Sequence, residues 1–181
     1  MQIALRAASP ADADAVAALH VEVWRRTYRA LAPPAAFQSL DFAARQRTWR
    51  GLLAAPKPGS ITLLAERDGA LAGFVHGGAP GDPAYGELGE VLGEVKYLYV
   101  ATAFARQGIG RRLLAAMAGR LVDLGYRGIG LGVVVGNDQA LAFYRALGGR
   151  VIGRYADPGP LWRSENQLCA WDDATVLTRL G

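Results

Sequence analysis

Cysteine and histidine are scarce in this chain of 181 residues. Cys169 is the only cysteine, and His20 and His76 are the only histidines. One cysteine excludes an internal disulfide, and the three residues together are too few for a typical Cys/His metal cluster. We therefore predict no bound metal. We expect both histidines to be packing residues rather than catalysts, and we expect a cytoplasmic location.

Long apolar runs and blocks of like charge are also missing. No apolar run approaches the ~20 residues of a membrane-spanning helix. Asp12 and Asp14 interrupt the N-terminal region where a signal peptide would need an apolar core, so we expect no export and no membrane partner. The net charge is +4 and the pI about 9.5, yet the 20 basic residues are scattered. We therefore predict no nucleic-acid partner. Salt-sensitive binding to unrelated duplexes would contradict this prediction.

The bulk composition is that of a globular protein. Hydrophobic residues make up 51% of the chain and charged residues 20%. A chain of this length suits one domain with a sizeable core, and we see no linker, repeat or low-complexity tract. We expect residues 1–181 to form a single domain.

Hydrophobic periodicity predicts the order β-α-α-β-β-β-α-β-α-β-β, a mixed sheet with helices on both faces. The expected strands are residues 2–7, 60–66, 70–76, 93–100, 129–135, 150–155 and 167–171. The first helix begins at Ser9-Pro10 and the second helical region covers residues 35–54. The third follows Gly108 with an apolar face that reaches Leu124, and the fourth begins at Asn137 or Asp138.

A glycine-rich turn between the strand at residues 93–100 and the third helix is the most informative feature. It reads Ala105-Arg106-Gln107-Gly108-Ile109-Gly110-Arg111. Amide N–H groups of a first helical turn lack intrahelical partners and favour negative charge. The turn is not a P-loop, because Arg111 and Arg112 stand where Lys-Ser/Thr is needed, and Leu113 replaces the third glycine of a dinucleotide-binding turn. A plain strand-to-helix turn remains the alternative.

The chain resembles the GCN5-related N-acetyltransferase (GNAT) superfamily over nearly its whole length. Family members carry a strand ending like Leu98-Tyr99-Val100, then Gln/Arg-x-x-Gly-x-Gly/Ala, and then Asn-x-x-Ala-x-x-Phe-Tyr-x-x-x-Gly. The last motif is matched by Asn137, Ala140, Phe143, Tyr144 and Gly148. The resemblance implies a mostly antiparallel mixed α/β (α+β) sheet of about seven strands with about four helices on its two faces. Ala105 departs from the usual Gln or Arg, and Gly149 from a frequent aromatic residue.

The resemblance also implies acetyl-CoA as donor and an amine as acceptor. The diphosphate would lie on the N–H groups of about Arg106–Arg111. The pantetheine arm would pair with the backbone of Leu98 and Val100 as an added strand. Asn137 would contact the pantetheine while it caps its helix. The complete set of expected donor-site residues is Leu98, Tyr99, Val100, Ala105, Arg106, Gln107, Gly108, Ile109, Gly110, Arg111, Asn137, Ala140 and Phe143.

Two residues are candidates for proton transfer. Glu94 matches the glutamate that the histone-modifying branch of the superfamily uses as a base, and period two would place it on the strand face of Leu98. A solvated edge carboxylate is the alternative. Tyr144 matches the tyrosine that faces the sulfur and would protonate the leaving thiolate; simple core packing is the alternative.

Acceptor recognition in such proteins falls to the first two helices and the loops beside the donor strand. We expect Trp24, Tyr28 and Glu87 to contact the acceptor, with Tyr85 and Trp162 as further candidates, although Trp24 also suits a core position. The predicted function is acetyl transfer to a primary amine of a small molecule or peptide. Acetylation of a protein N-terminus or lysine and non-catalytic acyl-CoA binding are the alternatives, and a homodimer is possible.

Overall fold

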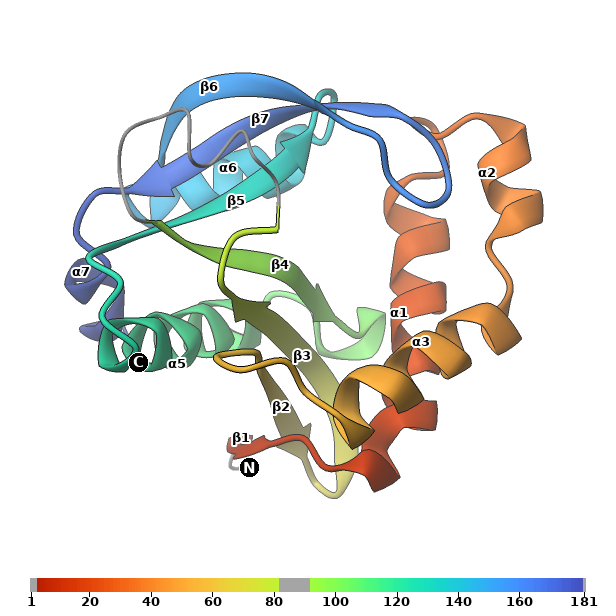
Figure 1. The fold of residues 1–181 in the computed structure, drawn as a ribbon, viewed down its shortest axis with the longest axis horizontal. Coiled ribbons are helices and arrows are strands. Elements are labelled where there is room, and N and C mark those ends of the chain that lie inside the picture. The colour runs from red at the N-terminus through yellow and green to blue at the C-terminus, as the bar shows by residue number, and fades with distance from the viewer. Residues whose placement is uncertain (1–2, 82–91, 181) are drawn as a thin grey trace.

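The computed structural model describes residues 3–81 and 92–180, and its strands form one seven-stranded sheet (Figure 1). The strand order is β1-β2-β3-β4-β5-β7-β6. The strands are β1 Ile3–Ala7, β2 Ile61–Arg67, β3 Ala70–Gly78, β4 Leu92–Val100, β5 Gly128–Val134, β6 Arg150–Asp157 and β7 Ser164–Trp171. Every strand expected from the sequence is present, with ends that differ by a few residues.

One neighbouring pair of strands is parallel and the others are antiparallel, as the resemblance implied. The parallel pair is β4 with β5, and its register covers only Leu92–Glu94 against Gly128–Gly130. Beyond these residues the two strands diverge, while β4 continues its pairing with β3 as far as Val100. The sheet therefore splays open between two central strands.

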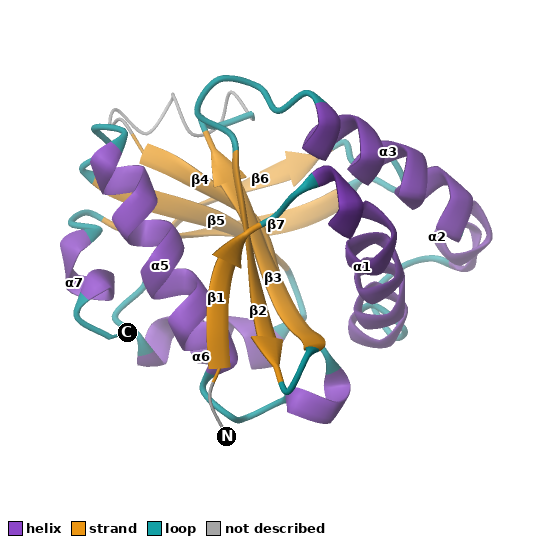
Figure 2. Ribbon diagram, turned by 90° about the horizontal axis from the view of Figure 1, so that it is seen from below, coloured by secondary structure: helices purple, strands orange, loops and turns teal. Residues whose placement is uncertain are grey.

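Helices cover both faces of the sheet (Figure 2). The helices are α1 Ala13–Thr27, α2 Pro34–Ser39, α3 Phe42–Ala54, α5 Ile109–Asp123, α6 Asp138–Ala146 and α7 Thr175–Thr178. α1 and α3 pack through Val16 and Trp49 against Leu64 and Phe74. α5 and α6 pack on the other face in a larger apolar cluster with β3, β4 and β5. The short α7 beside α5 was not expected from the sequence.

α5 ends where glycine predicts. Gly125 follows it with φ +92°, and the Tyr126 N–H donates to the Leu121 carbonyl oxygen at 3.1 Å, which closes the last turn. Leu113, Leu114, Met117 and Leu121 are buried as expected. The expectation for Leu124 was wrong. It is 48% exposed because it lies at the C-terminal boundary of α5, beyond the sheet surface that the rest of the apolar face covers.

The helical region expected at residues 35–54 is two helices rather than one. Leu40 has an extended backbone and Asp41 begins a new helix, with its Oδ1 accepting from the Ala44 N–H at 2.7 Å. The Arg25 guanidinium donates to the Leu40 carbonyl oxygen at 2.7 Å, which ties the end of α2 to α1. The apolar pattern does not reveal this break because the helical spacing of Phe37 and Leu40 continues up to it.

Among the described residues, no helix is long and apolar enough to cross a membrane.

Candidate active site

The opening between β4 and β5 leaves backbone groups of β4 pointing away from β3. The Ala101 N–H donates to the Ala72 carbonyl oxygen at 2.9 Å. Because opposed residues of an antiparallel ladder alternate between bonded and non-bonded pairs, Tyr99 and Tyr97 share the bonded type with Ala101. The backbone groups of Leu98 and Val100 therefore face the gap toward β5, as the resemblance implied.

The glycine turn lies directly after β4, at the mouth of this gap. Gly108 caps α5 in a left-handed conformation, with φ +78°, and Arg106 has φ +60°, which is uncommon outside glycine. The first i→i−4 bond of α5 runs from the Arg112 N–H to the Gly108 carbonyl oxygen at 3.1 Å. The N–H groups of Ile109, Gly110 and Arg111 precede it and lie at the positive end of the helix dipole.

The two glycines of the turn have different structural roles. A Cβ at Gly108 would meet no atom within 4 Å, so this position borders open space. Glycine is favoured there because the backbone has a positive φ. A Cβ at Gly110 would come within 3.4 Å of the Phe143 ring. A Cβ at this position would therefore make an ordinary contact with Phe143, and the two sequence motifs lie side by side.

α6 places Asn137, Ala140 and Tyr144 beside the gap. The Asn137 Oδ1 accepts from the Ala140 N–H at 3.3 Å, so the predicted cap is present. Tyr144 is 9% exposed, and its ring lies 5.1 Å from that of Phe143 and 6.1 Å from that of Trp171. Burial raises the pKa of Tyr144 well above its usual value, with smaller contributions from Tyr28 and Cys169. Its hydroxyl therefore stays protonated at neutral pH.

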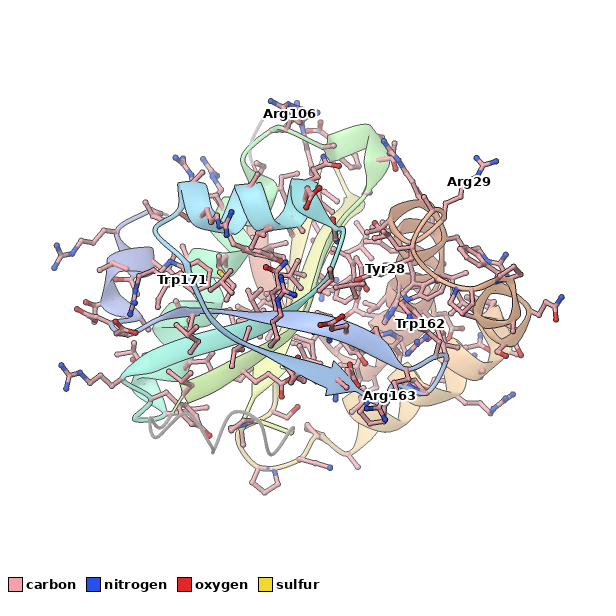
Figure 3. The ribbon with its side chains drawn as sticks, turned by 90° about the horizontal axis from the view of Figure 1, so that it is seen from above. Tyr28, Arg29, Arg106, Trp162, Arg163 and Trp171 are labelled. Atoms are coloured by element: carbon pink, nitrogen blue, oxygen red, sulfur yellow. The ribbon has the colours of Figure 1, made fainter. Side chains whose placement is uncertain are left out.

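Gly149 stands where the family often has an aromatic residue, and side chains from another part of the chain occupy the space beside it. A Cβ at Gly149 would lie 2.8 Å from the Trp171 ring and 2.7 Å from the Cys169 sulfur. The Trp171 indole N–H donates to the Leu147 carbonyl oxygen at 2.9 Å. Trp171 thus supplies the aromatic ring behind α6, and Figure 3 shows it beside that helix.

A bulge in β4 overturns the expectation that Glu94 shares a strand face with Leu98. The register with β3 shifts between Val95 and Tyr97. As a result Val95 packs with Leu98 in the α5 cluster, whereas Tyr97 packs on the α1–α3 face. Strand alternation then puts Glu94, next to Val95, on the face opposite Leu98. Its Oε2 accepts from the Gly81 N–H at 2.7 Å.

Tyr28, directly after α1, lies among side chains from several elements around the gap. Burial raises the pKa of Tyr99 well above its usual value, and Tyr28 adds to the rise; Tyr28 also contributes to the raised pKa of Tyr144. Burial raises the pKa of Tyr28, and the nearby Asp157 carboxylate adds to the rise. The side chain of Tyr99 thus lies on the α1 side of β4, while the backbone groups expected to meet the donor belong to its neighbours.

Trp24 and Trp162 continue this aromatic group. The ring centroids of Trp24 and Tyr28 are 5.1 Å apart, and Trp162 lies 5.4 Å from Trp24 and 5.6 Å from Tyr28. Trp24 is only 4% exposed, so most of its ring packs against other residues, whereas Tyr28 and Trp162 are half-buried. In Figure 3 Tyr28 and Trp162 lie side by side between α1 and the β6–β7 loop.

The two histidines are packed in the interior, as expected. His20 Nδ1 accepts from the Trp49 indole N–H at 3.1 Å, and burial lowers the pKa of His20 to about 3. His76 Nδ1 is 2.8 Å from Thr62 Oγ1, and burial lowers the pKa of His76 to about 4. Because the lone pair of His20 is already used in this bond, its ring has no free basic nitrogen.

Part of the predicted acceptor site lies outside the described residues. Glu87 and Tyr85 belong to residues 82–91. The exposed side chains of the glycine turn, Arg106 and Arg111, are described, and Figure 3 shows Arg106 pointing outward from the turn.

Sequence reasoning missed a polar strip on the β6–β7 hairpin. The strands extend beyond the expected ends, so Asp157 pairs with Ser164 and Tyr155 with Asn166. Tyr155 belongs with Leu168 to a cluster on the face away from α6, and alternation puts Asp157, Ser164 and Asn166 on that face too. The strand expected at residues 150–155 ends before Asp157, and the one expected at residues 167–171 begins after Asn166, so the expected strands did not contain this alternation.

The sequence matches one protein family over most of its length. The model of the acetyltransferase (GNAT) family matches residues 19–148. YuaI of Bacillus subtilis (strain 168), an uncharacterized N-acetyltransferase, is 27% identical over 144 residues, which are 80% of this chain and 78% of the relative.

Solved structures share the fold at lower sequence identity. The PaiA N-acetyltransferase from Thermoplasma acidophilum, in complex with coenzyme A, is 18% identical with a TM-score of 0.74, covering 94% of this chain and 98% of that one. The putative acetyltransferase yncA from Salmonella typhimurium, with acetyl-CoA, is 17% identical with a TM-score of 0.66, covering 94% of each chain.

Proposed function

Because this chain belongs to the acetyltransferase (GNAT) family and is an acetyl-CoA-dependent N-acetyltransferase, we propose that its acceptor is a primary amine of a small molecule or peptide. Transfer is direct, within a complex of both substrates. The observation that supports this best is the convergence of three elements at the β4–β5 gap: unpaired β4 backbone, the start of α5 and the buried Tyr144.

The glycine turn binds the diphosphate of the donor in this proposal. One helix dipole contributes about 0.3–1 kcal/mol, whereas micromolar affinity needs roughly −8 kcal/mol. Several charge-assisted hydrogen bonds of about 1.5–3 kcal/mol must therefore converge. The N–H groups from Gly108 to Arg111 can donate them together, and the absence of a Cβ at Gly108 keeps the approach open. Arg106 and Arg111 add positive charge.

The backbone of β4 holds the pantetheine arm and orients the thioester. The groups of Leu98 and Val100 that face the gap can pair with the arm's amides as an added strand. A β4 N–H in this position also donates to the acetyl oxygen as negative charge develops on it. The Asn137 side chain completes this wall from the start of α6.

Glu94 acts as the general base. An alkyl ammonium has a pKa near ~10.4, so attack at neutral pH requires removal of a proton from the amine. The β4 bulge supports this role, because it turns Glu94 toward the same face as Tyr97 and Tyr99 and therefore toward the α1 side of the gap. The acetyl-CoA thioester would contact the backbone groups of Leu98 and Val100 inside the gap, so Glu94 and the donor would approach the acceptor amine from different sides.

Tyr144 protonates the leaving group. The amine nitrogen attacks the acetyl carbon, the C–S bond breaks, and the sulfur takes the phenolic proton while the amine proton passes to Glu94. A neutral phenol is required, and Tyr144 is in that form at neutral pH. After the transfer, the proton held by Glu94 is released to solvent and Tyr144 takes one back, which restores both groups.

The experiment that tests this function is thiol release from acetyl-CoA with polyamines, aminoglycosides, amino acids and short peptides, together with calorimetric titration of CoA. Release with small amines or short peptides, and product mass increased by one acetyl group, is the expected result. Release only with folded proteins would favour the protein-acetylating alternative. CoA binding without release on any acceptor would contradict the proposal and favour an acyl-CoA-binding regulator.

A further inference from the structure

The β6–β7 hairpin presents a polar strip toward the acceptor side of the gap. Ser164 and Asn166 are buried, at 8% and 5% exposure, and the Ser164 hydroxyl donates to Asn166 Oδ1 at 3.3 Å. Tyr155 lies over Gly132, where a Cβ would come within 2.1 Å of its hydroxyl. Asp157 follows Tyr155 on the same face of β6 and pairs with Ser164. Among the four residues of the strip, it has the only charged side chain.

Asp157 is held in place without a cationic partner. Its Oδ1 accepts from the Gly159 N–H at 2.8 Å, so the loop itself orients the carboxylate. No arginine, lysine or histidine of the described residues forms an ion pair with it, and the residue is half-buried. A partly desolvated carboxylate gains strongly from a positive partner, because the surrounding medium screens it less than water does.

Aromatic rings stand beside this carboxylate. The charge of Asp157 acts on Tyr28, whose ring lies 5.6 Å from that of Trp162. The loop from Asp157 to Trp162 is compact: a Cβ on Gly159 would lie 2.6 Å from the Trp162 carbonyl oxygen. Carboxylate and ring faces together are the groups that bind ammonium and guanidinium ions.

Two arginines lie near this end of the hairpin, Arg154 on its outer face and Arg163 directly before β7. Arg154 lies 3.8 Å from Glu165, and both side chains are 63% exposed. Arg154, Arg163 and Glu165 line a surface hollow at the end of the hairpin, together with Tyr155 and Ser164 of the polar strip. Neither arginine forms an ion pair with Asp157. Within the polar strip, Asp157 is thus the charged side chain that an acceptor entering from the α1 side would meet, on the face to which the β4 bulge also turns Glu94.

We propose that Asp157, with the rings of Tyr28 and Trp162, binds a second cationic group of the acceptor, so that the preferred substrates are amines carrying another positive charge besides the nitrogen that is acetylated. The inference rests on the proposed function, and it deepens that function by naming the acceptor's charge. It distinguishes such amines from monoamines and from amino acids with a free carboxylate.

The test compares 1,4-diaminobutane and 1,8-diaminooctane with butylamine and octylamine, in the wild type and in Asp157→Asn. Asparagine retains an oxygen for the Gly159 N–H and removes only the charge. We expect at least one diamine to exceed its monoamine by about 10- to 100-fold in kcat/KM, mainly through KM, and Asp157→Asn to abolish that preference. Glu165→Gln, on the outer face, is the matched control and should leave the preference intact.

Calorimetric titration of the same amines into the CoA-bound enzyme separates this inference from the proposed function. Diamine binding that depends on Asp157, with no acetylation of any amine, would contradict the function and support the cation site. Neither diamine exceeding its monoamine in binding or in kcat/KM would overturn the inference. An equal loss for all four amines in Asp157→Asn would overturn it too, because that pattern indicates a structural role.

Discussion

Tyr144 is the residue at which acid catalysis can be separated from binding. Tyr144→Phe keeps the buried ring and its contacts with Phe143 and Trp171 and removes only the hydroxyl. We expect kcat to fall by about 100-fold, within the usual range for a lost proton donor, while the Kd for CoA changes less than twofold. Steady-state kinetics and calorimetry measure the two. Weaker CoA binding with unchanged kcat would contradict the assignment.

Glu94 makes the complementary prediction on the acceptor side. Glu94→Gln retains an oxygen that can accept from the Gly81 N–H but cannot take a proton. We expect kcat/KM at pH 7 to fall about 100-fold, and the deficit to shrink as the pH approaches the amine's own pKa of ~10.4. A pH–rate profile checks this. A deficit that is constant with pH would indicate positioning rather than base catalysis.

At the scale of elements, the two ends of α5 offer a matched pair of glycines. Gly108 and Gly125 have φ of +78° and +92°, and a Cβ at either would meet no atom within 4 Å. Alanine at either position should therefore lower the free energy of unfolding by a similar amount, about 1–2 kcal/mol. Only Gly108→Ala should weaken CoA binding, because its Cβ would enter the space proposed for the diphosphate.

Urea unfolding and CoA titration of both variants decide the point. If Gly108→Ala and Gly125→Ala bind CoA equally well, the N-terminal turn of α5 is not the phosphate site.

The whole molecule should lose stability in mild acid. The pKa values of His20 and His76 are about 3 and about 4 in the folded protein, against 6.5 in an unfolded chain. Below pH 6.5 the two imidazoles bind protons in the unfolded state but stay neutral in the folded state. The free energy of unfolding therefore falls as the pH falls. At pH 5 each histidine lowers it by ~2 kcal/mol, a large share of a typical total of about 5–15 kcal/mol.

Urea denaturation at pH 7.5, 6 and 5 measures this loss. His76→Gln removes one of the two titrating rings and should reduce the loss between pH 7.5 and 5 by about half, whatever its effect at pH 7.5. A free energy of unfolding that does not change over this range would show that neither histidine is buried in the neutral form.

Local patterns were sufficient for much of the fold. The glycine turn, the buried face of α5 and the Asn137 cap are encoded by residues a few positions apart, and each was predicted from the sequence. Where prediction failed, at Leu124 and at the break between α2 and α3, periodicity continued past the point where the chain leaves the core or bends.

The sequence by itself determined the family, the strand order along the chain, the glycine turn and the Asn137 cap, because these depend on short spacings that helices and turns convert directly into geometry. Only the tertiary structure decided which faces the side chains share. The β4 bulge, a register shift against β3, moved Glu94 to the face of Tyr97, and the length of the β6–β7 hairpin brought Asp157 toward Tyr28. Register between strands depends on long-range pairing, which local periodicity does not encode.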